Sequence, residues 1–181
     1  MFKGGGDKLL RNDNGKFIDV SEEAGIYGSL IGFGLGVRVG GVNNDLLPDI
    51  YVSNDFYERD YLYINNGDGT FSEDIKNRMG HLSMSSMGAD MADINNDGFI
   101  DIYCSVAGKF GPKNNLLYLN NGDNTFSEKA VEFGIDDDGN SVQSTFFDYD
   151  LDGDLDLYIG NYPPTNFNAP NHYYAYKMRN P

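Results

Sequence analysis

The segment that decides the fold reads Asp148-Tyr-Asp-Leu-Asp-Gly-Asp-Leu-Asp156 and continues as Leu-Tyr-Ile-Gly160. Two related copies precede it, Gly41-Val-Asn-Asn-Asp-Leu-Leu-Pro-Asp49 and Asp93-Ile-Asn-Asn-Asp-Gly-Phe-Ile-Asp101, and each is followed by Ile-Tyr. The copies begin at residues 41, 93 and 148, which are 52 and then 55 residues apart. An acidic, turn-forming loop between short apolar runs is typical of a β-hairpin. The three copies therefore predict three related hairpins.

A second element alternates with the first and has the same period. It reads Leu62-Tyr-Ile-Asn-Asn-Gly-Asp-Gly-Thr-Phe71, and its counterparts occupy residues 9–17 and 117–126. Each copy places an Asn-Gly pair between strand-forming residues, which is a strong hairpin signal. Two hairpins in a period of roughly 54 residues give about four strands, as in a β-propeller blade. We therefore predict an all-β chain built from blades of four antiparallel strands.

The repeats divide the chain into about three units, at approximately residues 8–54, 60–106 and 115–161, followed by a connecting segment at 162–181. Residues 1–181 are thus expected to form a single repeat region. Closed propellers usually contain about four to eight blades. Because three units fall short of that number, we predict a fragment or an open arc of a larger propeller.

The composition excludes several classes of partner. The chain has 28 acidic residues against 13 Lys and Arg, and its formal net charge is −15. This charge repels phosphate backbones and anionic lipid surfaces, so neither nucleic acid nor a membrane is an expected partner. No run of 18 apolar residues predicts a transmembrane helix, and the N-terminal residues lack the apolar centre of a signal peptide.

The acidic loops are candidate metal sites. In the third loop, carboxylates occupy positions one, three, five and nine: Asp148, Asp150, Asp152 and Asp156. Gly153 at position six permits a sharp turn, and Asp154 at position seven can offer its backbone carbonyl. Clustered carboxylates repel one another unless a cation is bound, and an all-oxygen site favours Ca²⁺ over Mg²⁺. Position twelve is apolar in every copy, so the loops are not EF-hands.

The other two loops carry fewer carboxylates. The expected ligands are Asp93, Asn95, Asp97, Phe99 through its carbonyl, and Asp101 in the second loop, and Asn43, Asp45, Leu47 through its carbonyl, and Asp49 in the first. The first loop also has Leu46 in place of the turn glycine, which costs about 1 kcal/mol if a left-handed conformation is needed. We predict two Ca²⁺ sites and a third at the degenerate first loop, with affinity rising from the first to the third. The alternative for each loop is a solvated acidic turn without a metal.

Aromatic residues recur in phase with the loops. Tyr51, Tyr103 and Tyr158 are predicted to lie in the core between blades, and Phe17, Phe71 and Phe126 are predicted core anchors. Cys104 is expected to be a small buried core residue. The segment after the third unit is rich in Tyr, Asn and Pro, and Tyr162, Tyr173 and Tyr174 are weak candidates for a ligand-binding surface. The alternative is an ordinary connection that covers a blade edge.

The loop pattern, the Asn-Asn-Gly-Asp-Gly-Thr-Phe element and the stretch Gly32-Phe-Gly-Leu-Gly36 resemble FG-GAP/VCBS repeats, as found in integrin α-chain propellers. The strings around the second and third loops are similar to those of bacterial proteins similar to cartilage acidic protein, which often carry an ASPIC/UnbV segment. The resemblance covers roughly residues 8–162. It implies Ca²⁺ in the hairpin loop of each blade and an extracellular, cell-surface or periplasmic location.

The function predicted from these features is that of a calcium-binding extracellular repeat module. The resemblance implies a role in binding or adhesion, with a protein or a carbohydrate at the cell surface as the partner, and no enzymatic activity. One alternative is the propeller part of a polysaccharide-degrading enzyme, which would need acids or bases outside the repeat pattern. The other alternative is a structural spacer without a ligand.

Overall fold

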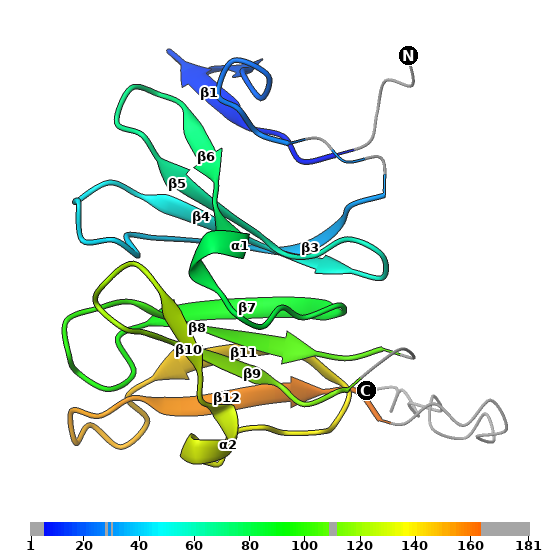
Figure 1. Cartoon of the computed structure of the whole chain (residues 1–181), viewed down its shortest axis with the longest axis vertical. Coiled ribbons are helices and arrows are strands. Elements are labelled where there is room, and N and C mark those ends of the chain that lie inside the picture. Colours follow the sequence, from blue (N-terminus) through cyan, green and yellow to red (C-terminus); the bar gives the residue numbers. More distant parts are fainter. Residues whose placement is uncertain (1–5, 28, 30, 109–111, 164–181) are drawn as a thin grey trace, which may run out of the picture.

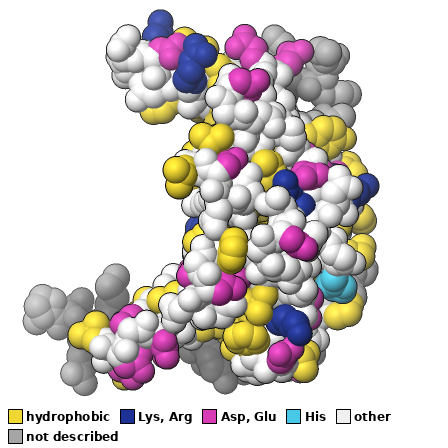
Figure 2. Space-filling view, turned by 60° about the vertical axis from the view of Figure 1, so that its left-hand side comes forward, with side chains coloured by type: hydrophobic (Ala, Val, Ile, Leu, Met, Phe, Trp, Pro, Cys, Tyr) yellow, Lys and Arg dark blue, Asp and Glu magenta, His cyan; other side chains and the backbone are white. Residues whose placement is uncertain are grey.

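The computed structural model describes residues 6–27, 29, 31–108 and 112–163. The described residues form an all-β molecule of twelve strands and two four-residue helices, and the strands form four antiparallel sheets. The sheets are stacked along the long axis in the order in which they occur in the chain (Figure 1). The stack is curved and hollowed along one side (Figure 2), so the molecule is an open arc of propeller-like blades.

Two complete blades lie in the middle of the stack, with a two-stranded sheet at each end. The complete blades have the strand orders β3-β4-β5-β6 and β7-β8-β9-β10, and the end sheets are β1-β2 and β11-β12. The strands are β1 Leu10–Asp13, β2 Lys16–Asp19, β3 Phe33–Gly40, β4 Asp49–Asp55, β5 Tyr61–Asn65, β6 Phe71–Glu73, β7 Ser86–Ala92, β8 Asp101–Val106, β9 Leu116–Asn120, β10 Phe126–Glu128, β11 Ser141–Phe147 and β12 Asp156–Asn161. The helices are α1 Ile75–Arg78 and α2 Ala130–Phe133. Within the described residues, neither helix has the length and apolarity needed to cross a bilayer.

The two complete blades have the same register. Ile50 of β4 lies opposite Tyr63 of β5, and Ile102 of β8 lies opposite Tyr118 of β9. The innermost strands β3, β7 and β11 also share a shift of register near their first residues. The predicted all-β fold of four-stranded antiparallel blades is therefore confirmed.

The largest apolar core lies between the two complete blades. Tyr51 and Cys104 are fully buried in it, and Tyr103 is fully buried on the opposite face of the second blade, as predicted. The prediction is wrong for Tyr158, which is 65% exposed. Tyr158 lies on the face of β12 that points away from the second blade, and among the described residues no further sheet covers that face.

The repeated phenylalanines show the same contrast. Phe126 is buried and Phe71 is half-buried, but Phe17 of β2 is 65% exposed. The prediction of a core anchor is therefore wrong for Phe17. Its two counterparts pack against a preceding unit, and the described residues contain no unit before β1-β2.

The inner strands of successive sheets approach each other closely. A Cβ atom built on Gly36 of β3 would lie 3.1 Å from the Cα atom of Gly88 in β7, and one on Gly88 would lie 2.8 Å from the carbonyl oxygen of Val142 in β11. The contact at Gly88 is closer than a real Cβ atom approaches a backbone atom, so this position requires glycine, and a side chain at Gly36 would need a small shift of β7. Beside them, the Arg38 guanidinium of β3 pairs with Asp90 of β7 at 3.0 Å.

A buried carboxylate joins the first complete blade to the second. Asp60, just before β5, accepts hydrogen bonds from the Asn54 backbone N–H at 2.7 Å and from the hydroxyls of Tyr51 and Ser86 at 2.6 Å. Ser86 belongs to β7, so the contact crosses between blades. Burial raises the pKa of Asp60 to about 6, and the three hydrogen bonds oppose that shift.

A neutral amide has the equivalent place in the next blade. Asn115, just before β9, accepts a hydrogen bond from the Val106 backbone N–H at 2.7 Å and donates one to the Ser141 hydroxyl of β11 at 2.9 Å. It is fully buried. Asp60 and Asn115 therefore connect neighbouring sheets at equivalent positions. Asp60 does so through an ionisable carboxyl, and Asn115 does so through a neutral amide.

Candidate metal centres

The three acidic loops connect β3 to β4, β7 to β8 and β11 to β12, and they project from the same side of the stack (left in Figure 1). Counting residues 41, 93 and 148 as position one, each loop has left-handed backbone at positions four and six. The residues with positive φ are Asn44 and Leu46, Asn96 and Gly98, and Leu151 and Gly153. The three sequences thus adopt one loop conformation, and Leu46 at position six of the first loop has left-handed backbone, with φ of 68°.

The third loop brings carboxylates together. One oxygen each from Asp148, Asp150 and Asp156 lies within 4.8 Å of the other two. The Asp148 Oδ2 atom accepts the Gly153 N–H at 3.1 Å, whereas its Oδ1 atom is buried without a hydrogen-bond partner among the described residues. A buried carboxylate oxygen without a donor is unfavourable unless a cation supplies the missing interaction. The donor set, which is all oxygen, therefore fits a hard divalent cation such as Ca²⁺.

The remaining predicted ligands of the third loop have other contacts. The Asp152 carboxylate accepts the Asp154 N–H at 3.0 Å and is not part of the converging group. The Asp154 carboxylate accepts a hydrogen bond at 3.2 Å from the side-chain amide of Asn96 in the second loop. Asp154 thus links two neighbouring loops.

The second loop is closed by hydrogen bonds to its own backbone. The two oxygens of Asp93 accept the N–H groups of Asp97 at 3.0 Å and Gly98 at 2.9 Å. The Asn95 amide donates to Asp97 at 2.8 Å, and Asp97 also accepts the Phe99 N–H at 2.9 Å. The five predicted ligand positions of the second loop therefore lie along one turn, which begins at Asp93 and ends at Asp101.

The first loop has the fewest charged groups. The Asn43 amide donates to Asp45 at 2.8 Å, and the Asp45 carboxylate accepts the Leu47 N–H at 2.8 Å. The side-chain amide of Asn44 reaches the Gly98 carbonyl of the second loop at 3.4 Å. The first and second loops are therefore in contact, as the second and third are.

The aspartate at position nine has a structural role that the sequence did not indicate. Asp101 is fully buried, and its two oxygens accept the Ile94 N–H at 2.9 Å and the Asn120 N–H of β9 at 2.8 Å. Asp49 makes the same pair of bonds, to Val42 and to Asn65 of β5, both at 2.9 Å. Burial raises the pKa of both carboxyls, and these hydrogen bonds oppose the shift. Position nine therefore ties each loop to the third strand of its blade.

In the third loop, the aspartate at position nine makes only one of these two hydrogen bonds. Asp156 accepts the Tyr149 N–H at 2.8 Å, and it is exposed. Among the described residues, no strand lies beyond β12 to provide the second N–H. This difference follows from the two-stranded sheet and could not be read from the repeat itself.

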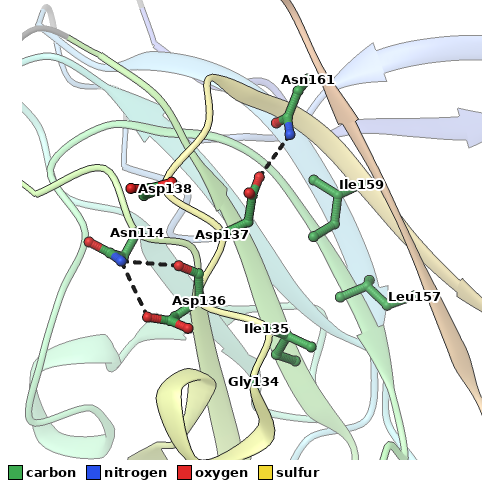
Figure 3. Close-up of a pocket in the computed structure, with 9 residues that line it drawn as sticks. All are labelled: Asn114, Gly134, Ile135, Asp136, Asp137, Asp138, Leu157, Ile159 and Asn161. Atoms are coloured by element: carbon green, nitrogen blue, oxygen red, sulfur yellow. Dashed lines mark hydrogen bonds between the residues drawn. The ribbon is translucent and has the colours of Figure 1, made fainter.

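A groove of about 590 Å³ lies beside β12 (Figure 3). Its walls combine apolar side chains, Ile135, Leu157 and Ile159, with the acidic turn at residues 136–138. The acids of this turn are already hydrogen bonded: the side-chain amide of Asn114 donates to Asp136 and that of Asn161 donates to Asp137.

The weak ligand-binding candidates are placed only in part. Tyr162 is exposed beyond the end of β12, where its backbone N–H donates to the Asn140 carbonyl at 3.1 Å. Tyr173 and Tyr174 lie outside the described residues, as does most of the connecting segment 162–181. A ligand surface at these tyrosines stays a prediction.

Comparison with known proteins gives two findings. A family model described as an FG-GAP-like repeat matches residues 41–104 and again residues 105–159. Cartilage acidic protein 1 of Xenopus tropicalis is 32% identical over 133 residues, which is 71% of this chain and 20% of that protein. The chain therefore spans about a fifth of the length of this curated relative.

Proposed function

The chain belongs to the FG-GAP-like repeat family, and we propose that it is a calcium-stabilised, non-enzymatic binding module of an extracellular, cell-surface or periplasmic β-propeller. The observation that carries the proposal is the third loop, where Asp148, Asp150 and Asp156 converge and one oxygen of Asp148 is buried without a donor. The family and the relative support an extracellular setting, and the family supports a protein partner.

The proposed mechanism is thermodynamic. Each bound ion would hold one acidic loop in its folded conformation, and an ion that binds only the folded state adds about 2.7 kcal/mol of stability at 100 times its Kd. Extracellular calcium modules typically have Kd values of about 10⁻⁴ to 10⁻³ M, so millimolar calcium would fill the loops. Because calcium affinity rises with the number of charged ligands, the third loop should bind Ca²⁺ most tightly, followed by the second and then the first.

The groove beside β12 supports a binding role, because its walls combine apolar side chains with an acidic turn. The acids at residues 136 and 137 accept hydrogen bonds from the side-chain amides of Asn114 and Asn161, and these bonds help to hold the turn.

Calcium titration with thermal unfolding tests the proposal. Calcium should raise the melting temperature and EDTA should lower it, with ionic strength matched by NaCl so that simple charge screening is held constant. The double variant Asp148→Asn/Asp150→Asn should lose the tightest calorimetric binding event, because two of the three converging carboxylates become neutral. The control Glu22→Gln removes an exposed acid outside the loops and should bind calcium as the native chain does.

Two results would contradict the proposal. One is a melting temperature that does not change between calcium and EDTA at matched ionic strength. The other is a calcium titration of the double variant that cannot be distinguished from that of Glu22→Gln.

A further inference from the structure

The same turn occurs before and after the first complete blade. The first junction lies between the β1-β2 sheet and this blade, and the second junction lies between the two complete blades (Figure 1). In the first, the Val20 N–H after β2 donates to the Leu9 carbonyl at 3.0 Å. In the second, the Asp74 N–H after β6 donates to the Leu62 carbonyl at 2.9 Å. The two turns are therefore equivalent, with an offset of 54 residues.

An arginine connects the two blades at the second junction. The side chain of Arg78 is only 14% exposed. Its Nε donates to the Asp74 carboxylate at 2.8 Å, and its Nη1 donates to the Asn124 carbonyl in the β9-β10 turn at 3.2 Å. A planar guanidinium with several N–H donors suits acceptors that belong to two different elements. Arg78 thus joins the turn of one blade to a hairpin of the next.

The equivalent place at the first junction has no arginine. Ala24 stands where the second turn has Arg78, and Val20 stands where it has Asp74; both smaller residues are buried. A pocket of about 390 Å³ lies here, lined by both residues and by residues 68–70 of the β5-β6 turn. Ligand pockets in proteins commonly measure about 300–1,000 Å³. The alanine therefore leaves open the space that an arginine side chain takes at the second junction.

The backbone acceptor of the second junction is also present at the first. Gly69 is the equivalent of Asn124, and both have left-handed backbone, with φ of 90° and 70°. In each turn the threonine that follows donates its N–H, at 3.0 Å, to the aspartate that precedes. The Gly69 carbonyl thus corresponds to the carbonyl that accepts Arg78, and no hydrogen-bond donor among the described residues pairs with it.

The charges around the pocket favour a cation. Glu23 and Asp68 line it with carboxylates. Hydrogen bonds from the hydroxyl and the backbone N–H of Thr70 hold the pKa of Asp68 below its usual value, so this acid is ionised at neutral pH. Arg11 also lines the pocket, but Asp13 holds its guanidinium through two hydrogen bonds of 2.8 and 2.9 Å. The chain as a whole has a net charge of −15, which attracts cationic partners.

We propose that this pocket binds an arginine side chain of a protein partner. The guanidinium donates to the Gly69 carbonyl and to the Glu23 carboxylate, which takes the part that Asp74 has at the second junction. The methylene stem of the arginine packs on Leu9 and Val20. The proposal names the chemistry of a partner for the binding module proposed above, and it rests on that function.

Amide NMR of the labelled chain tests the site with the peptide acetyl-Gly-Arg-Gly-amide at millimolar calcium. The peptide should shift the amide signals of Ala24, Gly69 and Thr70, with a Kd on the order of 1 mM because one side chain makes the contact. The same peptide with citrulline, which has the shape of arginine without its charge, should bind about fivefold more weakly or worse. A lysine peptide that binds as well as the arginine peptide would overturn the assignment to arginine.

A double variant fills the pocket from within. Val20→Asp/Ala24→Arg rebuilds the Asp74–Arg78 pair at the first junction without a change in net charge. Its own arginine should occupy the pocket, so the peptide should no longer shift the Gly69 signal, while the amide signals of the second blade stay unchanged. Undiminished peptide binding by this variant would overturn the proposal.

A milder pair of variants tests the charged acceptor. Glu23→Gln should weaken peptide binding by about two- to fivefold, the range of an exposed ion pair. Glu22→Gln, at an exposed acid that does not line the pocket, is the matched control and should bind the peptide as the native chain does. Equal effects of the two variants would contradict the site. A chain that melts higher in calcium but shows no peptide shifts would reject the arginine site and leave the calcium-stabilised module in place.

Discussion

At the scale of single residues, Asp60 and Asn115 occupy equivalent buried positions in neighbouring blades but differ in charge. Each accepts a backbone N–H from the preceding strand and contacts a serine of the next blade. The amide does this without an ionised group, whereas burial raises the pKa of Asp60 to about 6. The folded chain therefore holds a proton on Asp60 that the unfolded chain releases near its ordinary pKa of about 4.

The first prediction concerns Asp60→Asn. Since the folded pKa is raised, the native chain loses stability as the pH rises from about 4 to 6, and the loss is complete above 6. The shift corresponds to a free-energy cost on the order of 3 kcal/mol. Asp60→Asn should remove this cost, so its stability relative to the native chain should be greater at pH 7.5 than at pH 4.5 in denaturant unfolding.

The reciprocal variant Asn115→Asp is the matched control. It introduces a buried carboxyl at the equivalent place, so it should destabilise the chain more at pH 7.5 than at pH 4.5. A difference between Asp60→Asn and the native chain that does not change with pH would contradict the assigned role of Asp60.

At the scale of elements, the three acidic loops reach one backbone conformation from three sequences. Position six is glycine in the second and third loops but Leu46 in the first, and all three have positive φ. A β-carbon disfavours left-handed backbone by about 1–2 kcal/mol. Leu46 is 96% exposed, so its side chain contributes no core contact that would offset this strain.

The second prediction is that Leu46→Gly stabilises the chain. Relief of the left-handed strain should raise the free energy of unfolding by up to about 1 kcal/mol, reduced by the greater freedom of glycine in the unfolded chain. Leu46→Ala is the control, since it removes the exposed side chain but keeps the β-carbon. Denaturant unfolding that gives both variants the same gain would show that strain is not the cause.

Features of these elements that depend on neighbouring residues in the sequence could be predicted, whereas features that depend on contacts with distant residues could not. The blades followed from the repeats, because hairpin signals and strand patterns are local. The exposure of Tyr158 and Phe17 did not, since their repeat positions match those of buried residues and only the neighbouring sheet differs. The sequence also identified Asp101 as an acid of the second loop. It did not predict the hydrogen bond that Asp101 accepts from the Asn120 N–H, because this bond depends on the packing of a strand 19 residues further along the chain.

At the scale of the whole molecule, the curved stack carries its acidic loops along one side. Nine of the 28 acids are proposed ligands in these loops. Filling three loops with Ca²⁺ would bring the net charge from −15 to about −9. Calcium would thus reduce repulsion within the molecule as well as order the loops.

The contacts between neighbouring loops have a consequence for cooperativity. Asn44 reaches the Gly98 carbonyl of the second loop, and Asn96 reaches the Asp154 carboxylate of the third. An ion that immobilises the third loop would also immobilise the acceptor for Asn96, and the second loop would then lose less conformational entropy when it binds its own ion. Calcium at one loop would favour calcium at the next, so the row of loops would respond to concentration more steeply than independent sites.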